Sequence, residues 1–354
     1  MSATASGAQR RIAPAALRAG SSDVLVACDL EREAADAVAA VLVATDLRGV
    51  HTHGVALLPW YAEGLRSGRI APQGRPAIVR DQGASAVIDA GGGMGHLAAL
   101  AALRLACERA AAHGVAAVAV RRSSHCGAIG HYTRLAADTG MVGMVFATSV
   151  PTMAPPGGHE RVLGNNPWSV AVPMDHGASV VVDSAFSAVS RGRIVGHARD
   201  GEPLEDGWAL DADGRPTVDP AAALAGLLQP IGGYKGAGLA LAVGLLATVA
   251  GAGFGEELGS LSEGSLPGRD GLLALALNPD AFDEAGAART RAAAAVDRLR
   301  SSAPVPGGTV TLPGDRSDAV ARRNAKQGVP LDDATRDALV RLCGELGLEG
   351  SAFT

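Results

Sequence analysis

The chain has 354 residues and a formal net charge of −5, from 31 basic and 36 acidic side chains. This small acidic excess argues against a binding surface for nucleic acid or for anionic membranes. The 5 Phe, 3 Tyr and 3 Trp are too few for a platform that stacks bases. Hydrophobic residues make up 47% of the chain, so it can bury a sizeable core, and its length fits two domains.

The four cysteines, Cys28, Cys107, Cys126 and Cys343, have no short spacing such as C-x-x-C. They therefore predict neither a zinc knuckle nor a disulfide framework. The first ten residues lack the apolar centre of a secretion signal, and the longest apolar run, near 239–250, is too short to cross a bilayer. We expect a cytoplasmic protein with reduced thiols, no metal and no membrane partner.

The pattern of apolar residues predicts the elements in chain order. The first twenty residues have no period and predict an unstructured tail. Apolar residues spaced by three and four predict helices at 31–48, 59–68, 131–138, 236–249, 285–300 and 332–346, and one that follows Gly91–Gly93 and ends near 112. Short apolar runs predict strands at 86–88, 115–120, 142–148, 170–172, 179–183, 272–277 and 309–312. This alternation predicts the α/β class.

The glycine-rich segments do not form a known phosphate loop. Neither Gly91–Gly93 nor Gly236–Gly238 continues into G-x-G-x-x-G, and no G-x-x-x-x-G-K-[ST] occurs, so a Rossmann or Walker loop is unsupported. Lys235, flanked by four glycines at the start of a predicted helix, can reach a phosphate, ribose or carboxylate. The competing interpretation is a solvated lysine at a helix start.

Histidines occur at two breaks between apolar stretches. His51 and His53 lie in one, and His125 follows directly on a buried strand, where α/β proteins often place ligands. Histidine suits proton donation because its pKa lies near neutrality. Two alternatives are ordinary loop histidines and a metal site that uses His51 and His53.

Two further segments allow more than one interpretation. Ser124 or Ser184 could serve as a hydrolase nucleophile with Asp183, but the G-x-S-x-G elbow is absent. Asp183 ends an apolar strand and either caps that strand or orients a catalytic histidine. The polar loop 163–168 either lines a site or forms a plain turn.

A series of motifs, in order from residue 46 to 314, together resembles the type-2 malate/L-lactate dehydrogenase family, which includes NAD- or NADP-dependent malate, lactate, sulfolactate and ureidoglycolate dehydrogenases and cyclic-imine carboxylate reductases. The motifs are 46–50 with 52–55, 124–128 with Gly130 and Tyr132, 154–158, 164–167, 191–194, 207–211, 232–236 and 312–314.

The resemblance implies an α/β fold that is similar to that of sulfolactate dehydrogenase and is not a Rossmann fold, which agrees with the missing glycine fingerprint. It implies a central domain for the nicotinamide cofactor at 81–309 and a helical domain built from both ends, 1–80 and 310–354. Family members are typically homodimers with sites near the subunit interface, so we expect a homodimer that acts on a small-molecule substrate.

The resemblance also implies catalytic roles. His53 matches the family's proton donor, with Thr52 where serine is usual and Asp183 as the acid that completes a relay. His125 matches a second histidine, which is the acid/base in some members, so the choice between His53 and His125 stays open. Arg48 matches an arginine associated with the substrate carboxylate, a role that suits a bidentate guanidinium.

Other positions match cofactor contacts in the family and predict NADPH or NADH as the cofactor, with NADPH preferred. These positions are His125, Cys126, Gly127, Ala128, Ile129, Val172, Pro173, Met174, Lys235, Pro313, Gly314 and Asp315.

Four departures from the family pattern bear on the substrate. Leu57 stands where a second carboxylate-binding arginine is common, Asn165 replaces a substrate-contacting threonine, and Trp168 and Cys126 replace a smaller aliphatic residue and a phenylalanine. A dicarboxylate needs more than one cationic anchor, so the pattern disfavours malate. It favours a monocarboxylic 2-oxo acid, a cyclic imine acid or a related biosynthetic ketone or imine.

A function of another class is a catalytically silent relative that binds a nucleotide or metabolite without turnover. The joint presence of His53, His125, Asp183 and Lys235 argues against it, because a lineage that has lost catalysis is expected to lose at least one of them.

Overall fold

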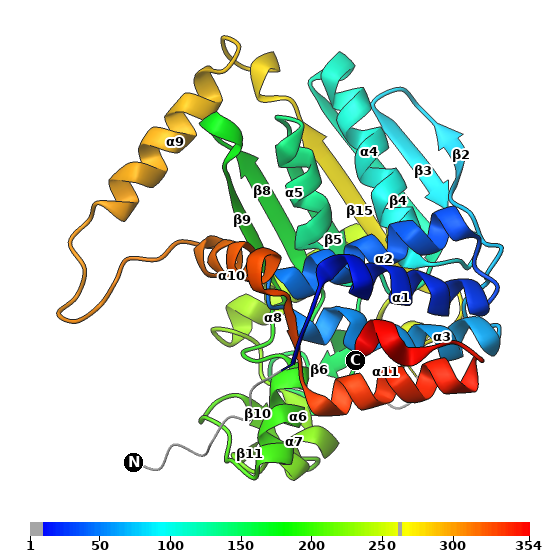
Figure 1. The fold of residues 1–354 in the computed structure, drawn as a ribbon. Helices are drawn as coiled ribbons and strands as arrows, with labels where there is room; N and C mark the ends of the chain where they lie inside the picture. The colour runs from blue at the N-terminus through cyan, green and yellow to red at the C-terminus, as the bar shows by residue number, and fades with distance from the viewer. Residues whose placement is uncertain (1–9, 261–263) are drawn as a thin grey trace.

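A computed structural model describes residues 10–260 and 264–354 (Figure 1). Its centre is a seven-stranded sheet with the strand order β2-β3-β4-β15-β5-β8-β9. The strands of this sheet are β2 (Ala77–Asp81), β3 (Ser85–Asp89), β4 (Val115–Ser123), β5 (Val142–Ala147), β8 (Trp168–Pro173), β9 (Ser179–Ser184) and β15 (Asp270–Leu277).

The sheet is mixed and mainly antiparallel. Within it only β3 and β4 run parallel, with Ala86 opposite Val118. Strand β15 lies between β4 and β5 and is antiparallel to both, so that Ala274 pairs with Val118 on one side and Val145 on the other. The predicted α/β class is confirmed. Strand β4 runs parallel to β3 and antiparallel to β15.

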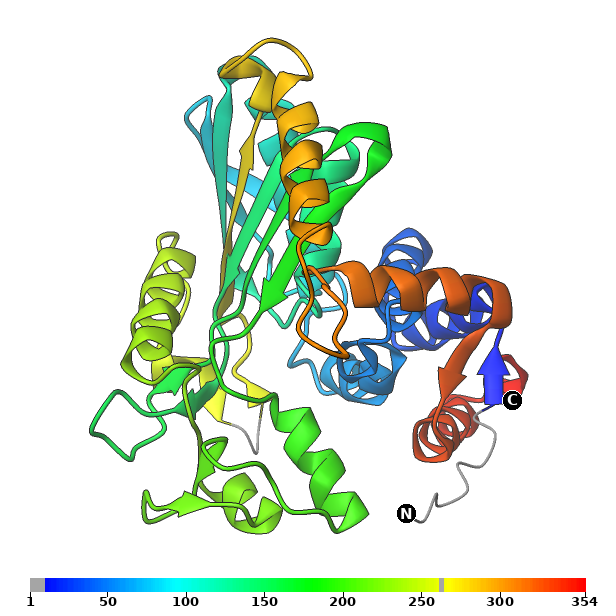
Figure 2. The ribbon, with the colours of Figure 1, turned by 90° about the vertical axis from the view of Figure 1, so that its left-hand side faces the viewer.

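Helices cover both faces of the sheet. Helices α4 (Gly95–His113) and α5 (Gly130–Asp138) lie on the face seen in Figure 1, and α8 (Tyr234–Ala247) packs on the opposite face (Figure 2). The alternation along β5 shows this directly, because Val145 packs with α4 and α5 whereas Phe146 packs with α8. Helix α5 packs closely on β5. A Cβ atom added to Gly143 of β5 would lie 2.6 Å from Cβ of Ala136 on α5.

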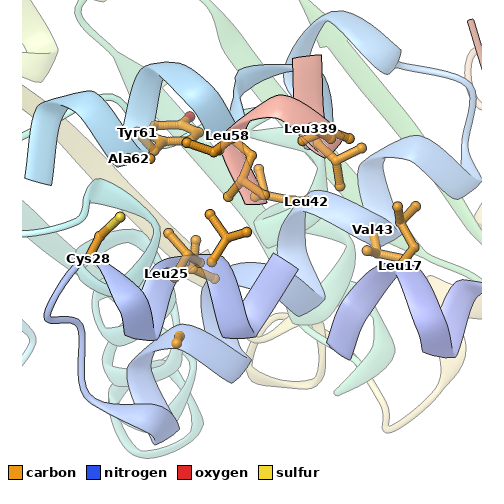
Figure 3. Packing of buried hydrophobic residues seen from close by; sticks show 14 of the residues in the cluster. Leu17, Leu25, Cys28, Leu42, Val43, Leu58, Tyr61, Ala62 and Leu339 are labelled. Carbon is orange, nitrogen blue, oxygen red and sulfur yellow. The ribbon is translucent and has the colours of Figure 1, made fainter. Parts of the chain in front are cut away.

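Both ends of the chain contribute to a second hydrophobic core (Figure 3). Its helices are α1 (Pro14–Ala27), α2 (Arg32–Leu47), α3 (Leu58–Arg66) and α11 (Asp333–Glu345). The short strands β1 (Arg10–Ile12) and β16 (Val329–Leu331) pair antiparallel and hold the two ends of the chain together. The core includes Leu17, Leu42, Leu58, Tyr61 and Leu339, all fully buried.

A third cluster joins residues 153–254, among them Met153, Ile194, Trp208 and Val243. The helices and strands outside the sheet and the second core are β6 (Pro151–Met153), β7 (Leu163–Gly164), α6 (Arg191–Asp200), β10 (Ala209–Leu210), β11 (Pro216–Thr217), α7 (Pro220–Ala225), β12 (Leu227–Leu228), β13 (Gly259–Ser260), β14 (Gly264–Ser265), α9 (Ala287–Arg300) and α10 (Asp315–Gln327).

No helix of the described chain is both long and apolar enough to cross a bilayer.

Two expectations about elements are wrong, and β2, α6, α7 and α10 were not predicted. Residues 10–20 belong to β1 and α1 rather than to a tail, while residues 1–9 lie outside the described part. Helix α1 shows no apolar period because Gly20, Ser21 and Ser22 occupy buried positions. Residues 309–312 form no strand, since no described strand pairs with them. Helix α10 was missed because its only buried residue is Asn324.

Candidate functional site

The turn that carries His53 is organised by the buried carboxylate of Asp46, at the end of α2. Asp46 Oδ1 lies 2.8 Å from His51 Nδ1, and Oδ2 accepts the backbone N–H of Val55 at 2.7 Å. Gly54 is required between them, because a Cβ there would lie 2.2 Å from the carboxyl group. Burial raises the pKa of Asp46, and its hydrogen bonds to His51 and Val55 oppose this rise.

His53 lies at the end of this turn, the 3₁₀ helix His51–His53. Its Nδ1 is 3.0 Å from the hydroxyl of Thr52, and among the described residues its Nε2 has no hydrogen bond. Gly192, at the start of α6, packs so closely on Thr52 that a Cβ would come within 2.8 Å of the Thr52 methyl group. Burial lowers the pKa of His53, which favours the neutral ring.

His125 lies in the loop between β4 and α5, and its ring is 5.8 Å from that of His53, centroid to centroid. The two loops touch, since the carbonyl oxygen of His53 is 3.8 Å from an ideal Cβ on Gly127. Burial and the neighbouring His53 lower the pKa of His125 to about 3. The structure thus brings together the two histidines between which the sequence left the proton transfer open.

A cavity of about 650 Å³, the size of a typical ligand site, is lined by His51 of the histidine turn and by Ala128 of the β4–α5 loop, whereas neither His53 nor His125 is among its lining residues. Its wall includes four residues predicted from the sequence: Arg48, Ala128, Asp183 and Gly314. These come from the end of α2, the β4–α5 loop, β9 and the start of α10, four segments far apart in the chain.

Arginines give this cavity a cationic side. Arg48 and Arg134 both pair with Asp318 of α10, Arg134 at 3.2 Å. Arg316 and Arg323 also line the cavity, and neither makes an ion pair within the described residues. His131 completes this side, and burial, with Arg48 and Arg134 nearby, lowers its pKa to about 4.

Asp183 is the acidic group of the cavity wall. Its side chain opens onto the cavity, and Oδ2 accepts the backbone N–H of Gly130 at 2.9 Å. Surrounding protein removes much of its hydration and raises its pKa to about 6 despite that hydrogen bond. Within the described residues no hydrogen bond joins Asp183 to Thr52 or His53, so the relay remains a prediction.

Other predicted residues lie away from this wall. Val172 and Pro173 end β8 and Met174 follows it, so that Val172 lies about 10 Å along the strand pair from Asp183 and Met174 lies farther. Lys235 is exposed at the start of α8. Asn165 accepts a hydrogen bond from the Ser149 hydroxyl at 2.8 Å, and Trp168 stacks on Phe186 at 6.2 Å.

The remaining cofactor-matching positions flank the wall. Cys126 and Ile129 are buried beside Ala128. Pro313 and Asp315 adjoin Gly314, and Asp315 pairs with Arg300 at 2.8 Å.

The metal and hydrolase alternatives find no supporting geometry. His51 already pairs with Asp46, and no group of three metal-binding side chains occurs in the described part of the chain. The Ser124 hydroxyl donates to the carbonyl of Gly93 and accepts from the N–H of Gly95, and that of Ser184 donates to the carbonyl of Ala185. Within the described residues, neither serine hydroxyl forms a hydrogen bond with a histidine.

Sequence reasoning missed Asp46, Tyr61, His131, Arg316 and Arg323 as parts of the site. Asp46 and His131 lie in or beside motifs that were recognised, and a search for polar residues in apolar helices would have marked Asp46. Arg316 and Arg323 lie two turns apart on α10, a helix whose polar sequence gave no period.

The cavity fits a nicotinamide dinucleotide. The N-terminus of α10, where Gly314 has a φ of +95°, faces the cavity beside Arg316, and helix N-termini and arginines both bind phosphate. A Cβ on Gly314 would lie 3.6 Å from the backbone of Val181 on β9. This helix start can therefore hold the pyrophosphate, and Arg316 and Arg323 can hold a further phosphate group.

Comparisons with known proteins found a matching family model and similar relatives. Residues 12–340 match the family model described as malate/L-lactate dehydrogenase. The chain is 34% identical over 327 residues to L-sulfolactate dehydrogenase of Methanothermobacter thermautotrophicus, covering 92% of this chain and 94% of that protein. It is 34% identical over 320 residues to Δ1-pyrroline-2-carboxylate reductase 2 of Burkholderia multivorans, covering 87% and 90%. The solved sulfolactate dehydrogenase of Methanocaldococcus jannaschii superposes with a TM-score of 0.90 at 32% identity, covering 97% of this chain and 99% of that one.

Replacing Asp46 tests its role in holding the histidine turn. Asp46→Ala leaves the Val55 N–H and the His51 ring without their partner, so we expect a loss of about 1–3 kcal/mol in the free energy of unfolding. Urea unfolding measures this loss, and Glu33→Ala, an exposed acid on the same helix, is the control and should change stability by less than about 0.5 kcal/mol. Equal effects of the two substitutions would show that Asp46 does not organise the turn.

Proposed function

Because the chain belongs to the malate/L-lactate dehydrogenase family, we propose that it transfers a hydride between a nicotinamide cofactor and the carbon of a C=O or C=N group. The substrate class is a small 2-oxo acid or a cyclic imine acid. The observation that carries the proposal is the His53–His125 pair, whose two loops also supply His51 and Ala128 to the wall of an arginine-lined cavity.

The chemistry divides between cofactor and protein. The bound cofactor supplies or accepts the hydride at its nicotinamide ring. The chain's own residues position the substrate, exclude water and move one proton to the oxygen or nitrogen that the reduction leaves negatively charged. His53 is suited to that proton transfer, because its Nε2 is free and its Nδ1 is held by Thr52.

The substrate proposal rests on the residues beside the histidines. Leu57 stands at the position of a second anchoring arginine and, with Trp60, packs against the apolar core. Arg48 then remains as the candidate anchor for one carboxylate, although it pairs with Asp318 in this structure. A single anchor suits a monocarboxylic substrate and disfavours malate or oxaloacetate.

The cofactor preference follows from the free arginines. Arg316 and Arg323 line the cavity without an acidic partner among the described residues, so they are available to a phosphate group. We propose that they contact the 2′-phosphate of NADPH, which makes NADPH the preferred cofactor.

The oligomeric state is proposed from an exposed apolar face. Helix α8 lies on the side of the sheet away from α1, α2 and α10, and Leu239, Leu241, Leu245 and Leu246 are each 41–53% exposed on it (Figure 2). Large exposed apolar patches mark association sites. We propose that α8 packs against a second copy of this chain in a homodimer with two-fold symmetry.

The alternative of a silent binding relative differs from this proposal in turnover alone. It would bind NADPH in the same cavity, but it would not oxidise NADPH in the presence of any 2-oxo acid or cyclic imine. Cofactor binding followed by fluorescence and turnover followed by absorbance separate the two.

The proposed reaction predicts oxidation of NADPH with a monocarboxylic 2-oxo acid or a cyclic imine acid, and a lower kcat/KM with oxaloacetate. His53→Ala should lower kcat by about 10²–10⁴-fold, because it removes the general acid, while cofactor affinity stays within about 3-fold. The measurement is the decrease in nicotinamide absorbance, with His113→Ala at the distant end of α4 as the control. Full turnover in His53→Ala would overturn the assignment.

The cofactor proposal predicts a selective loss of NADPH binding. Replacing Arg316 and Arg323 together by Ala should raise KM for NADPH by about 10–100-fold, since charged hydrogen bonds contribute about 1.5–3 kcal/mol, and leave KM for NADH nearly unchanged. Arg322→Ala on the same helix is the matched control, because Arg322 does not line the cavity. Equal losses for the two cofactors would contradict the proposal.

The dimer proposal predicts twice the chain mass in sedimentation equilibrium. Leu241→Glu combined with Leu245→Glu should shift the mass to that of one chain, because charges would be buried in an apolar interface. Leu135→Glu, an exposed leucine on α5, should leave the mass unchanged. A monomeric wild-type protein at micromolar concentration would refute the proposal.

A further inference from the structure

Tyr61 is a fully buried tyrosine whose hydroxyl reaches the site. It lies on α3, in the core formed by the two ends of the chain, among Leu58 and Ala62 (Figure 3). Its hydroxyl oxygen is 2.7 Å from Nδ1 of His125, and the two rings stack with centroids 6.1 Å apart. On its other side the ring of His96 packs edge-on at 5.0 Å.

The surroundings of Nδ1 determine which ring nitrogen of His125 carries the proton. The backbone N–H of Gly127 also points at Nδ1, at 3.4 Å, and a backbone N–H can only donate. A proton on Nδ1 would therefore face the Gly127 hydrogen. Nδ1 must accept, the Tyr61 hydroxyl must donate to it, and the proton of the neutral ring lies on Nε2.

His53 differs from His125 in this respect. Its Nδ1 partner is the hydroxyl of Thr52, which can donate or accept, so His53 can gain and lose a proton without losing that hydrogen bond. His125 can take a second proton only at Nδ1, and two donors occupy that position. The geometry therefore divides the two histidines into one that can exchange a proton and one that cannot.

We propose that Tyr61 is a positioning residue that, with the Gly127 N–H, locks His125 as the neutral Nε2–H tautomer, so that His125 offers a fixed hydrogen-bond donor to the substrate while His53 transfers the proton. The inference rests on the proposed function for the identity of the acceptor, the carbonyl oxygen or imine nitrogen. The lock itself is a property of the free protein.

The groups that face His125 support a neutral ring. His53, His96 and the Cys126 thiol lie around it, and burial lowers the pKa of His96 to about 3 and raises that of Cys126 to about 12. Burial also raises the pKa of Tyr61, with smaller contributions from Cys126 and Asp270, so its hydroxyl keeps the proton that it donates.

The test is ¹⁵N NMR of the ring nitrogens in the full-length protein labelled with ¹⁵N-histidine, with His125 assigned from His125→Gln. We expect an unprotonated Nδ1 and a protonated Nε2 throughout pH 5–9. Tyr61→Phe keeps the ring in the core and removes only the hydroxyl, so His125 should then show both tautomers or titrate at higher pH. Tyr234→Phe is the control, because it removes a hydroxyl from an exposed tyrosine at the start of α8, outside this core, and there His125 should stay locked.

Kinetics give a second readout. In Tyr61→Phe we expect kcat to fall about 3–10-fold, the effect of one ordinary hydrogen bond, with KM for the cofactor within 2-fold and a new ionisation in the acid limb of the pH profile. An Nδ1-protonated His125 in the wild-type protein would overturn the proposal, as would an unchanged His125 spectrum in Tyr61→Phe.

The wild-type spectrum decides the question even if a variant does not fold. It also separates this inference from the proposed function. A locked tautomer without NADPH turnover would refute only the function, and turnover with an unlocked His125 would refute only the inference.

Discussion

The site depends on one buried carboxylate. Asp46 holds the His51 ring through one oxygen and the Val55 N–H through the other, with Gly54 pressed against it. Burying a charged carboxylate is unfavourable unless hydrogen bonds compensate, so the turn must close tightly around Asp46 to satisfy it. This closure fixes the backbone on both sides of His53 and carries α3, with Tyr61, against the β4–α5 loop.

Two otherwise similar histidines acquire different chemistry from their partners. A hydroxyl, which can both donate and accept, faces Nδ1 of His53, whereas a hydroxyl and a backbone N–H crowd Nδ1 of His125. Arg134, Arg316 and Arg323 line the cavity from α5 and α10, and Arg48 lines it from the end of α2. Neither His53 nor His125 is among the lining residues, so the charge proposed to bind a cofactor is separate from the two neutral rings. Desolvation favours those neutral rings, and this combination suits reduction of a C=O or C=N group near neutral pH.

Much of the fold could be predicted from the sequence, because the central strands are continuous apolar runs and most helices carry a visible period. Helices α1 and α10 could not, since small polar residues fill the buried positions of α1 and nearly all of α10 is polar. The strand order was also beyond local pattern, because β15 pairs with residues more than 120 positions away. His53 and His125 could be predicted from motifs, whereas the roles of Asp46 and Tyr61 depend on contacts that only the folded chain shows.

The central claim is that the histidine pair and the arginine-lined cavity together form one active site. The most direct measurement is a crystal structure of the protein with NADPH and a non-reducible 2-oxo acid analogue. We predict the 2′-phosphate at Arg316 and Arg323, the nicotinamide ring toward the histidines, and the analogue's keto-equivalent oxygen within hydrogen-bond distance of Nε2 of both His53 and His125. A nicotinamide bound elsewhere, with neither histidine in contact with the analogue, would contradict it.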